Sequence, residues 1–262
     1  MVSLLSVRLP GVLAHGKSQY EPLNDVLPPE LKSVSYSGSV FRANDEIAHI
    51  SSLVEVSAQR ADSVVLVGSS LGGMLVPFVV STLSEDIRQQ LKIVIVDAPT
   101  GAETIMDSNA RFLGSRVVGG TFVTVMRALP FNMPVGDDML PKPSEISNLL
   151  DVDAVRAQAR DDLNGHRLSM FFSQTAWMVR VGRDGLHNED GLLKQVCRSL
   201  KGLDVTYLSC THPGNGVVRQ PEASNWWNAY SFGVKQEVVN GTHCGYLQNQ
   251  PEFVRAFEKI LQ

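Results

Sequence analysis

The sequence has few cysteines, no long apolar run and no extended stretch of one charge. Its three cysteines, Cys197, Cys210 and Cys244, are an odd number without C-x-x-C spacing, so neither a disulfide framework nor a zinc site is expected. No apolar run is long enough to span a bilayer, and the first residues lack the basic segment and long apolar core of a signal peptide. We therefore expect no metal, a reducing compartment and a cytoplasmic location.

The charge of the chain argues against two classes of partner, nucleic acids and anionic membranes. The 262 residues carry a formal net charge of -4, with a pI near 5.9. Such a chain is not expected to bind nucleic acid or an anionic membrane, and we expect a small-molecule substrate, with a homodimer left open. The length suits one large α/β domain, or a smaller one that carries an inserted cap.

One stretch, residues 63–77, organises the rest. It begins with four apolar residues, VVLV at 64–67, which indicate a strand covered on both faces. The next five, GSSLG at 68–72, fit the pattern G-x-S-x-G, in which the serine sits on a sharp turn from strand to helix. An apolar helical segment follows. The turn would lift the hydroxyl of Ser70 clear of the sheet, where the amide of Leu71 can donate to a developing oxyanion.

The remaining elements alternate between strand and helix. Apolar runs bounded by turn residues predict strands at residues 3–9, 31–37, 64–67, 92–99, 203–208 and 236–239. Helical periodicity lies between or after them, at about residues 20–27, 44–60, 71–83 and 251–261. Because parallel strands need crossovers that helices usually supply, this order predicts an α/β fold with a doubly wound, mostly parallel sheet.

The pattern changes between residues 101 and 201. There, helical segments broken by glycine and proline are predicted at 112–129, 144–163, 168–181 and 192–200. This stretch is too long for one crossover, so we expect a helical cap inserted between core segments 1–100 and 202–262. Met126, Phe171 and Trp177 are candidates for lining a substrate pocket under the cap. The alternative is that they pack against the sheet or against each other.

These residues together resemble the α/β-hydrolase superfamily, over most of the chain except the cap. The resemblance implies that Ser70 is the nucleophile of a catalytic triad. It also implies a histidine in the loop after the last strand, and GTHCGY at residues 241–246 closely resembles that loop, which identifies His243. The second donor of the oxyanion hole would be the amide of Val12, after the glycine of the first loop. If the register instead uses the H-G pair at 15–16, the donor is Lys17.

The third triad member departs from the pattern of the superfamily. Its acid commonly follows the strand before the histidine strand, and the matching loop here offers Asn215. An asparagine can orient an imidazole, but it stabilises the imidazolium less well than a carboxylate does. Asp97, at the end of the strand after the turn, is the other candidate, since some members of the superfamily carry their acid there. A turn-capping role is the alternative for Asp97, and the sequence leaves both residues open.

The resemblance implies a cofactor-free serine hydrolase of the esterase or thioesterase type. Its substrate would be an ester or thioester of a small to medium, partly apolar molecule, cleaved through an acyl-enzyme on Ser70. Two alternatives stay open. One is a non-hydrolytic enzyme of the same fold, a lyase or cyclase, and the other is a ligand-binding protein with a decayed triad.

Overall fold

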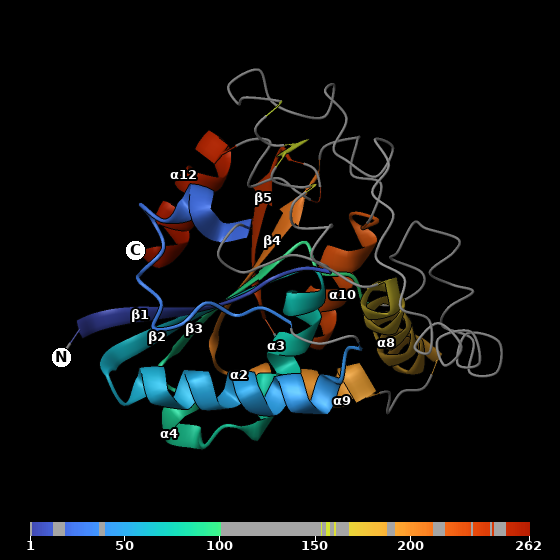
Figure 1. The fold of residues 1–262 in the computed structure, drawn as a ribbon, viewed down its shortest axis with the longest axis horizontal. Helices are drawn as coiled ribbons and strands as arrows, with labels where there is room; N and C mark the ends of the chain where they lie inside the picture. The colour runs from blue at the N-terminus through green and yellow to red at the C-terminus, as the bar shows by residue number, and fades with distance from the viewer. Residues whose placement is uncertain are drawn as a thin grey trace.

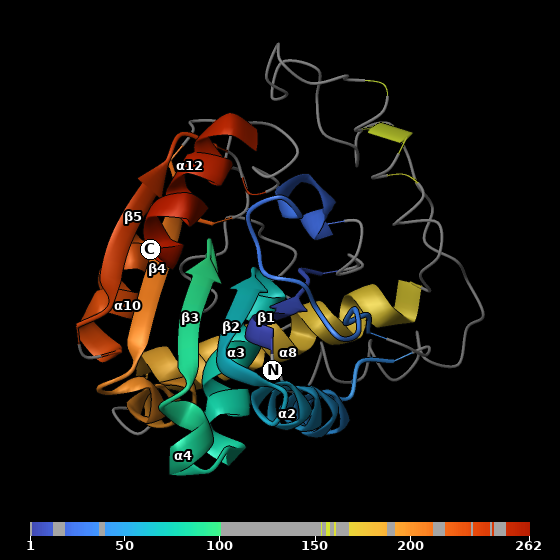
Figure 2. The same cartoon turned by 90° about the vertical axis from the view of Figure 1, so that its left-hand side faces the viewer.

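The computed structural model carries a parallel β-sheet between two layers of helices (Figure 1). The residues that it describes are 2–12, 19–36, 40–100, 153, 156, 157, 160, 168–187, 192–211, 218–231, 233–241, 243 and 250–262. Within them, five strands pair in chain order: β1 (Val2–Leu9), β2 (Ala61–Ser69), β3 (Leu91–Val96), β4 (Asp204–Cys210) and β5 (Lys235–Val239). All four pairings are parallel, and Figure 2 shows the strands side by side. The predicted parallel α/β sheet is confirmed.

The two faces of the sheet bury alternate residues of each strand. In β2, Val64 and Leu66 belong to one apolar cluster, whereas Val65 and Val67 belong to the other. The helices that contribute to the first cluster are α2 (Ala43–Ala58), α3 (Leu71–Thr82), α8 (Leu168–His187), α9 (Leu192–Cys197) and α10 (Glu222–Tyr230). Those that cover the second face are η1 (Glu21–Leu23) and α12 (Gln250–Leu261). Burial on both faces explains why the strands read as continuous apolar runs.

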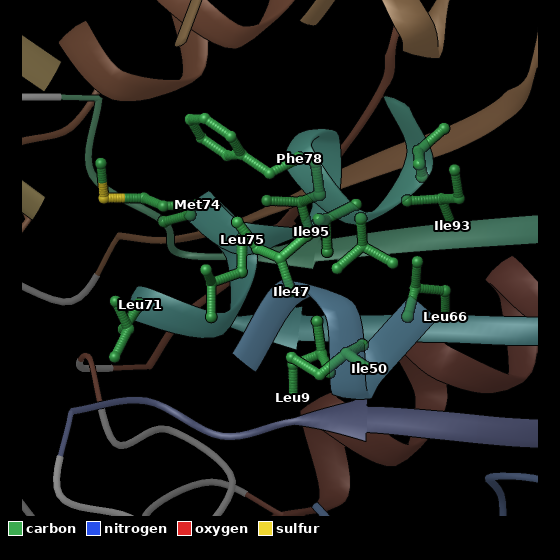
Figure 3. Packing of buried hydrophobic residues seen from close by; sticks show 14 of the residues in the cluster. Leu9, Ile47, Ile50, Leu66, Leu71, Met74, Leu75, Phe78, Ile93 and Ile95 are labelled. Atoms are coloured by element: carbon green, nitrogen blue, oxygen red, sulfur yellow. The ribbon is translucent and has the colours of Figure 1, made fainter. Parts of the chain in front are cut away.

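Helix α3 lies at the centre of the larger cluster. Every residue from Leu71 to Val80 is buried, as expected for a helix that is apolar on all sides. Figure 3 shows side chains of α3 meeting Ile47 and Ile50 of α2 and residues of the first three strands. Two short elements lie in connections on this side of the sheet: α4 (Glu85–Arg88) between α3 and β3, and η4 (Arg198–Leu200) between α9 and β4. The helix that follows Ser70 is therefore packed against neighbouring elements along its first ten residues.

The strand predicted at residues 31–37 is wrong for the described positions up to 36. The chain from residue 30 to 36 forms isolated bridges: Glu30 makes a parallel bridge with Ser6 of β1, and Ser35 is also a bridge residue. Pro28 and Pro29 precede the bridge and have no N–H to donate to a ladder. Their carbonyls instead accept bonds from Ser6, through its backbone N at 2.8 Å and its Oγ at 2.6 Å. This segment lies beyond β1, on the side away from β2, so the chain runs outward from β1 and then returns across it, as double winding requires.

The predicted cap falls mostly outside the described residues, including the helices expected at 112–129 and most of 144–163. The helices expected at 168–181 and 192–200 are confirmed as α8 and as α9 with η4. Met170, Met178 and Leu193 from these helices join the larger core cluster. Whether residues 101–201 form an inserted cap stays a prediction.

The described residues offer neither a candidate membrane span nor a candidate metal site. Among them, no helix combines the length and the apolar character that crossing a membrane requires. The same part of the chain contains no group of three or more His, Cys, Asp or Glu side chains placed to hold a metal ion.

The burial of the central strands predicts a large difference between two valine-to-alanine substitutions. Val94 of β3 is 0% exposed, whereas Val238 of β5 is 63% exposed. We expect Val94→Ala to lower the free energy of unfolding by about 2–3 kcal/mol, from lost apolar burial and the cavity left behind. The matched Val238→Ala should change it by less than about 1 kcal/mol. Equilibrium unfolding in urea measures both, and equal effects would contradict the layered arrangement.

Candidate active site

Ser70 occupies a strained turn between β2 and α3. Its backbone angles are φ 53 and ψ -117, a conformation that side-chain-bearing residues rarely adopt. The amide of Ser70 donates to the Val96 carbonyl at 3.0 Å, and the Ser70 carbonyl accepts from the Met74 amide at 3.1 Å. Leu71 is the first residue of α3, so its N–H precedes the intrahelical bonds and is available to a ligand at the helix N-terminus.

Close backbone approach at two glycines makes this turn possible. A Cβ added at Gly68 would lie 2.6 Å from the Gly72 carbonyl oxygen, and one added at Gly72 would lie 2.7 Å from the Pro10 carbonyl oxygen. Real Cβ atoms do not come this near to backbone atoms. The glycines of the motif therefore bring β2, α3 and the loop after β1 into contact.

The loop after β1 passes directly beside Ser70. A Cβ added at Gly11 would lie 3.3 Å from the Cβ of Ser70. Two buried phenols fix the backbone that leads into this loop, because Tyr20 donates to the Leu9 carbonyl at 2.7 Å and Tyr36 donates to the Pro10 carbonyl at 2.9 Å. Burial raises the pKa of Tyr36 well above its usual value, so its hydroxyl stays protonated and remains a donor.

The two candidate donors of the oxyanion hole differ in what the structure describes. Val12 directly follows Gly11, which lies next to Ser70, and its side chain packs against the larger core cluster. Lys17, the alternative, lies outside the described residues. The role of Val12 as the second donor stays a prediction.

The structure brings Asp97 and His243 together from positions 146 residues apart. Nδ1 of His243 lies 2.7 Å from Oδ2 of Asp97. Asp97 comes directly after β3, is 0% exposed and has a φ of 43, a left-handed conformation that aspartate tolerates better than most residues. An ionised carboxylate only accepts hydrogen bonds, so the contact assigns the donor role to Nδ1, and in the tautomer that this assignment implies Nε2 has a lone pair.

Several neighbours hold the Asp97 carboxylate. Its other oxygen, Oδ1, accepts from Nε2 of Gln220 at 2.9 Å and, at a longer 3.4 Å, from the amide of Cys210. The amide of Asp97 itself donates to the Leu208 carbonyl at 2.8 Å. Such bonds offset the cost of burying a charge. Asp97 thus has a defined partner in His243, whereas Asn215, the other candidate, lies outside the described residues.

The structure gives ring contacts for two of the three predicted pocket-lining residues, Trp177 and Phe171, and these contacts are with other aromatic side chains. Trp177 packs edge-on against Phe41 and at a tilt against Phe78, with ring centroids 5.7 Å and 5.5 Å away. Because Phe78 follows Ser70 by about two helical turns along α3, Trp177 contacts that helix roughly 12 Å from its N-terminus. Phe171 pairs with Phe172 at 5.5 Å, and Met126 lies outside the described residues. A lining role for the three stays a prediction.

Solved structures with the same overall architecture are numerous, although their sequences differ widely from this one. A lipase-esterase related protein from Clostridium acetobutylicum superposes with a TM-score of 0.59 at 13% identity, covering 98% of this chain and 93% of its own. A 2-hydroxy-6-oxo-6-phenylhexa-2,4-dienoate hydrolase from Rhodococcus sp. strain RHA1 gives 0.59 at 12% identity, over 99% and 90% of the two chains. The chain has the α/β-hydrolase fold.

A third structure with the α/β-hydrolase fold, the enol-lactonase from Burkholderia xenovorans LB400, gives a TM-score of 0.58 at 12% identity, covering 100% of this chain and 92% of its own. No family profile and no curated protein matches the sequence. In the α/β-hydrolase fold, a serine on a turn from strand to helix and a histidine late in the chain are the expected positions of nucleophile and base. Ser70 lies on such a turn and His243 follows β5, and their roles as nucleophile and base stay predictions.

Sequence reasoning missed Gln220, which contacts Asp97. It lies in the same connection between β4 and α10 as Asn215, one of the two residues that the sequence offers for orienting His243. A glutamine beside a helix start carries no motif that would single it out. Only the spatial arrangement reveals its contact.

The close approach at Gly72 generates a prediction for Gly72→Ala. The added methyl group would displace the backbone at Leu9 and Pro10, so we expect a loss of about 1–3 kcal/mol in the free energy of unfolding. The loop beside Ser70 should shift as well, which slows any reaction at this serine. Urea unfolding and the rate of modification by a fluorophosphonate measure the two effects. A variant that matches the natural protein in both would show that the loop is not packed on Gly72.

Proposed function

We propose that the chain is a serine hydrolase that cleaves carboxylic esters or thioesters through an acyl-enzyme on Ser70. The observation that carries the proposal is the 2.7 Å contact between His243 and the buried Asp97, at the sheet edge where the strained Ser70 turn lies. A buried carboxylate, an imidazole with its Nδ1 proton engaged and a serine on a strained turn are the parts of a triad. The order of nucleophile before histidine also matches the fold.

In the proposed reaction, His243 acts as general base and then as general acid. Its Nε2 takes the proton of Ser70 as Oγ attacks the carbonyl carbon, and it returns that proton to the leaving alcohol or thiol. The carboxylate of Asp97 keeps the Nδ1 proton in place and stabilises the imidazolium that forms. Water then attacks the acyl-enzyme and loses a proton to His243, which passes that proton to the departing Ser70 oxygen as the carboxylic acid is released.

Backbone amides would stabilise the charge that develops on the carbonyl oxygen. The amide of Leu71 stands at the N-terminus of α3, where the helix dipole favours negative charge. The amide of Val12 would be the second donor, since the loop that carries it runs beside Ser70. Two such donors typically contribute several kcal/mol to catalysis.

Two observations support an ester as the substrate: the descriptions of proteins with the same fold, and the apolar side chains on α8. The relatives of the same fold include proteins described as lipase-esterase related and as an enol-lactonase, and a lactone is a cyclic ester. Apolar side chains on α8, such as Phe171, suit a partly hydrophobic acyl or alcohol group. We propose a small to medium substrate on this basis, to be surveyed with p-nitrophenyl esters of increasing acyl length.

Covalent labelling tests the proposal without knowledge of the substrate. Intact-mass analysis after treatment with a fluorophosphonate should show one adduct on the natural protein. Ser70→Ala and His243→Ala should abolish it, because one removes the nucleophile and the other its base. No adduct on the folded natural protein would refute the proposed nucleophile.

The third triad member needs its own comparison. We expect Asp97→Asn to slow labelling by about 10³- to 10⁴-fold, the scale of loss when an amide holds the imidazole in the wrong tautomer. Asn215→Ala should label at nearly the natural rate. The opposite ranking would make Asn215 the orienting group and leave Asp97 with a structural role.

A further inference from the structure

The side chain of Gln220 connects Asp97 to a second buried group. Its Nε2 donates to Oδ1 of Asp97 at 2.9 Å and to the hydroxyl of Tyr207 at 3.0 Å. Its Oε1 accepts from the backbone amide of Ser224 at 3.2 Å. Ser224 lies in the first turn of α10, where backbone N–H groups have no intrahelical partner. Both ends of the amide are therefore engaged, one at the carboxylate and one at the helix.

Only one orientation of this amide satisfies its surroundings. Burial, together with the nearby Asp97 charge, raises the pKa of Tyr207 well above its usual value, so the phenol stays protonated. Its hydroxyl donates to the Ala98 carbonyl at 3.2 Å and has lone pairs, but no further proton, to offer Gln220. Because Tyr207 and Asp97 both accept, the NH₂ group of Gln220 must face them and its oxygen must face Ser224.

Within the function proposed above, we propose that Gln220 is a positioning residue that holds the Asp97 carboxylate in the orientation His243 requires. A carboxylate rotates about its terminal torsion unless both oxygens are engaged. Here Oδ2 faces His243 and Oδ1 faces Gln220, so the two contacts fix the plane of the carboxylate from opposite sides. The second contact to Oδ1, from the Cys210 amide, is longer at 3.4 Å and holds it less firmly.

Gln220 is itself held in place, which explains why a neutral side chain can fix the orientation of the Asp97 carboxylate. Tyr207 hydrogen-bonds the Ala98 carbonyl, which also accepts from Nε1 of Trp227 at 2.9 Å. The amide is thus tied to α10 and to the segment directly after Asp97. A cation at this position would compete with His243 for the carboxylate, whereas an amide can donate to Oδ1 without neutralising the charge that the imidazolium needs.

The test compares Gln220→Met with a matched substitution, Gln236→Met. Gln236 contacts the Ser224 carbonyl at the exposed side of α10, at 3.2 Å, away from Asp97. We expect Gln220→Met to lower the rate constant of Ser70 phosphonylation by about 10- to 100-fold, the scale of one lost hydrogen bond to a charged group. Gln236→Met should remain within about twofold. Circular dichroism and melting temperature establish that each variant is folded.

A second variant keeps the hydrogen bond from the Ser224 amide at the start of α10, which Gln220→Met removes. Gln220→Glu keeps an oxygen for the Ser224 amide but removes the NH₂ donor and adds charge next to Asp97. It should label as slowly as Gln220→Met or more slowly, and the repulsion between the two carboxylates should also lower its melting temperature, so labelling is measured where the variant is folded. Labelling at the natural rate by a folded Gln220→Met or Gln220→Glu protein would overturn the proposal.

A double-mutant cycle separates positioning from a general structural effect. If Gln220 acts through Asp97, then Gln220→Met should cost less than about threefold when it is added to Asp97→Asn, because the group it positions is already lost. An equal fold-loss in both backgrounds would overturn the proposal and assign Gln220 a structural role. If the natural protein shows no adduct on Ser70, the proposed function fails instead, and these rates are not compared.

Proton NMR of the resting protein gives a readout that does not need turnover. The Nδ1 proton of His243, shared with Asp97, should appear as a downfield imidazole resonance that His243→Gln removes. Gln220→Met should shift it upfield or broaden it, and Gln236→Met should leave it in place. An unchanged resonance in Gln220→Met would contradict the positioning role, even if this variant reacted slowly with the fluorophosphonate.

Discussion

The turn at Ser70 is the constraint on which the surrounding structure depends. A serine at φ 53 and ψ -117 costs energy on the order of 1–3 kcal/mol, and it persists only where packing leaves no alternative. That packing comes from the close approach of β2, α3 and the loop after β1 at Gly68 and Gly72. It also comes from the burial of residues 71–80 of α3 against the sheet. The strain and the rigid core are therefore parts of one arrangement.

Much of this arrangement follows from the sequence because its causes are local. A run of apolar residues without alternation, glycines at the turn and an all-apolar helix predicted β2, the turn and α3 correctly. The segment 31–37 shows the limit. Val34 and Tyr36 are buried and Ser35 is exposed, which gives the alternation of a strand. Ser35 forms a bridge, but in the described residues this pairing does not extend into a strand. Pro28 and Pro29 have no N–H with which to extend the pairing towards Glu30.

The site is less predictable because its contacts join distant parts of the chain. The sequence left Asp97 and Asn215 as equal candidates, since spacing along the chain does not tell which loop reaches an imidazole. The geometry connects Asp97 to His243 across 146 residues. Gln220 carried no signal at all, because its role depends on Tyr207 and Asp97, which come from two neighbouring strands. Side-chain networks of this kind follow from sheet order and register, which sequence patterns do not specify.

The register of the sheet explains how the roles of two loops can be exchanged. Val96 of β3 pairs with Leu208 of β4, so the carboxyl ends of these strands lie side by side and either can present a group to the same imidazole. In this chain the carboxylate comes from the end of β3, and the connection after β4 supplies the amide of Gln220. The reverse arrangement would place the carboxylate after β4 and the neutral donor after β3. It would supply the same chemical groups, provided that both oxygens of the carboxylate are held. The fold thus constrains where the acid, amide and imidazole meet, but not which strand carries which, and this freedom is compatible with a shared fold at 12–13% identity.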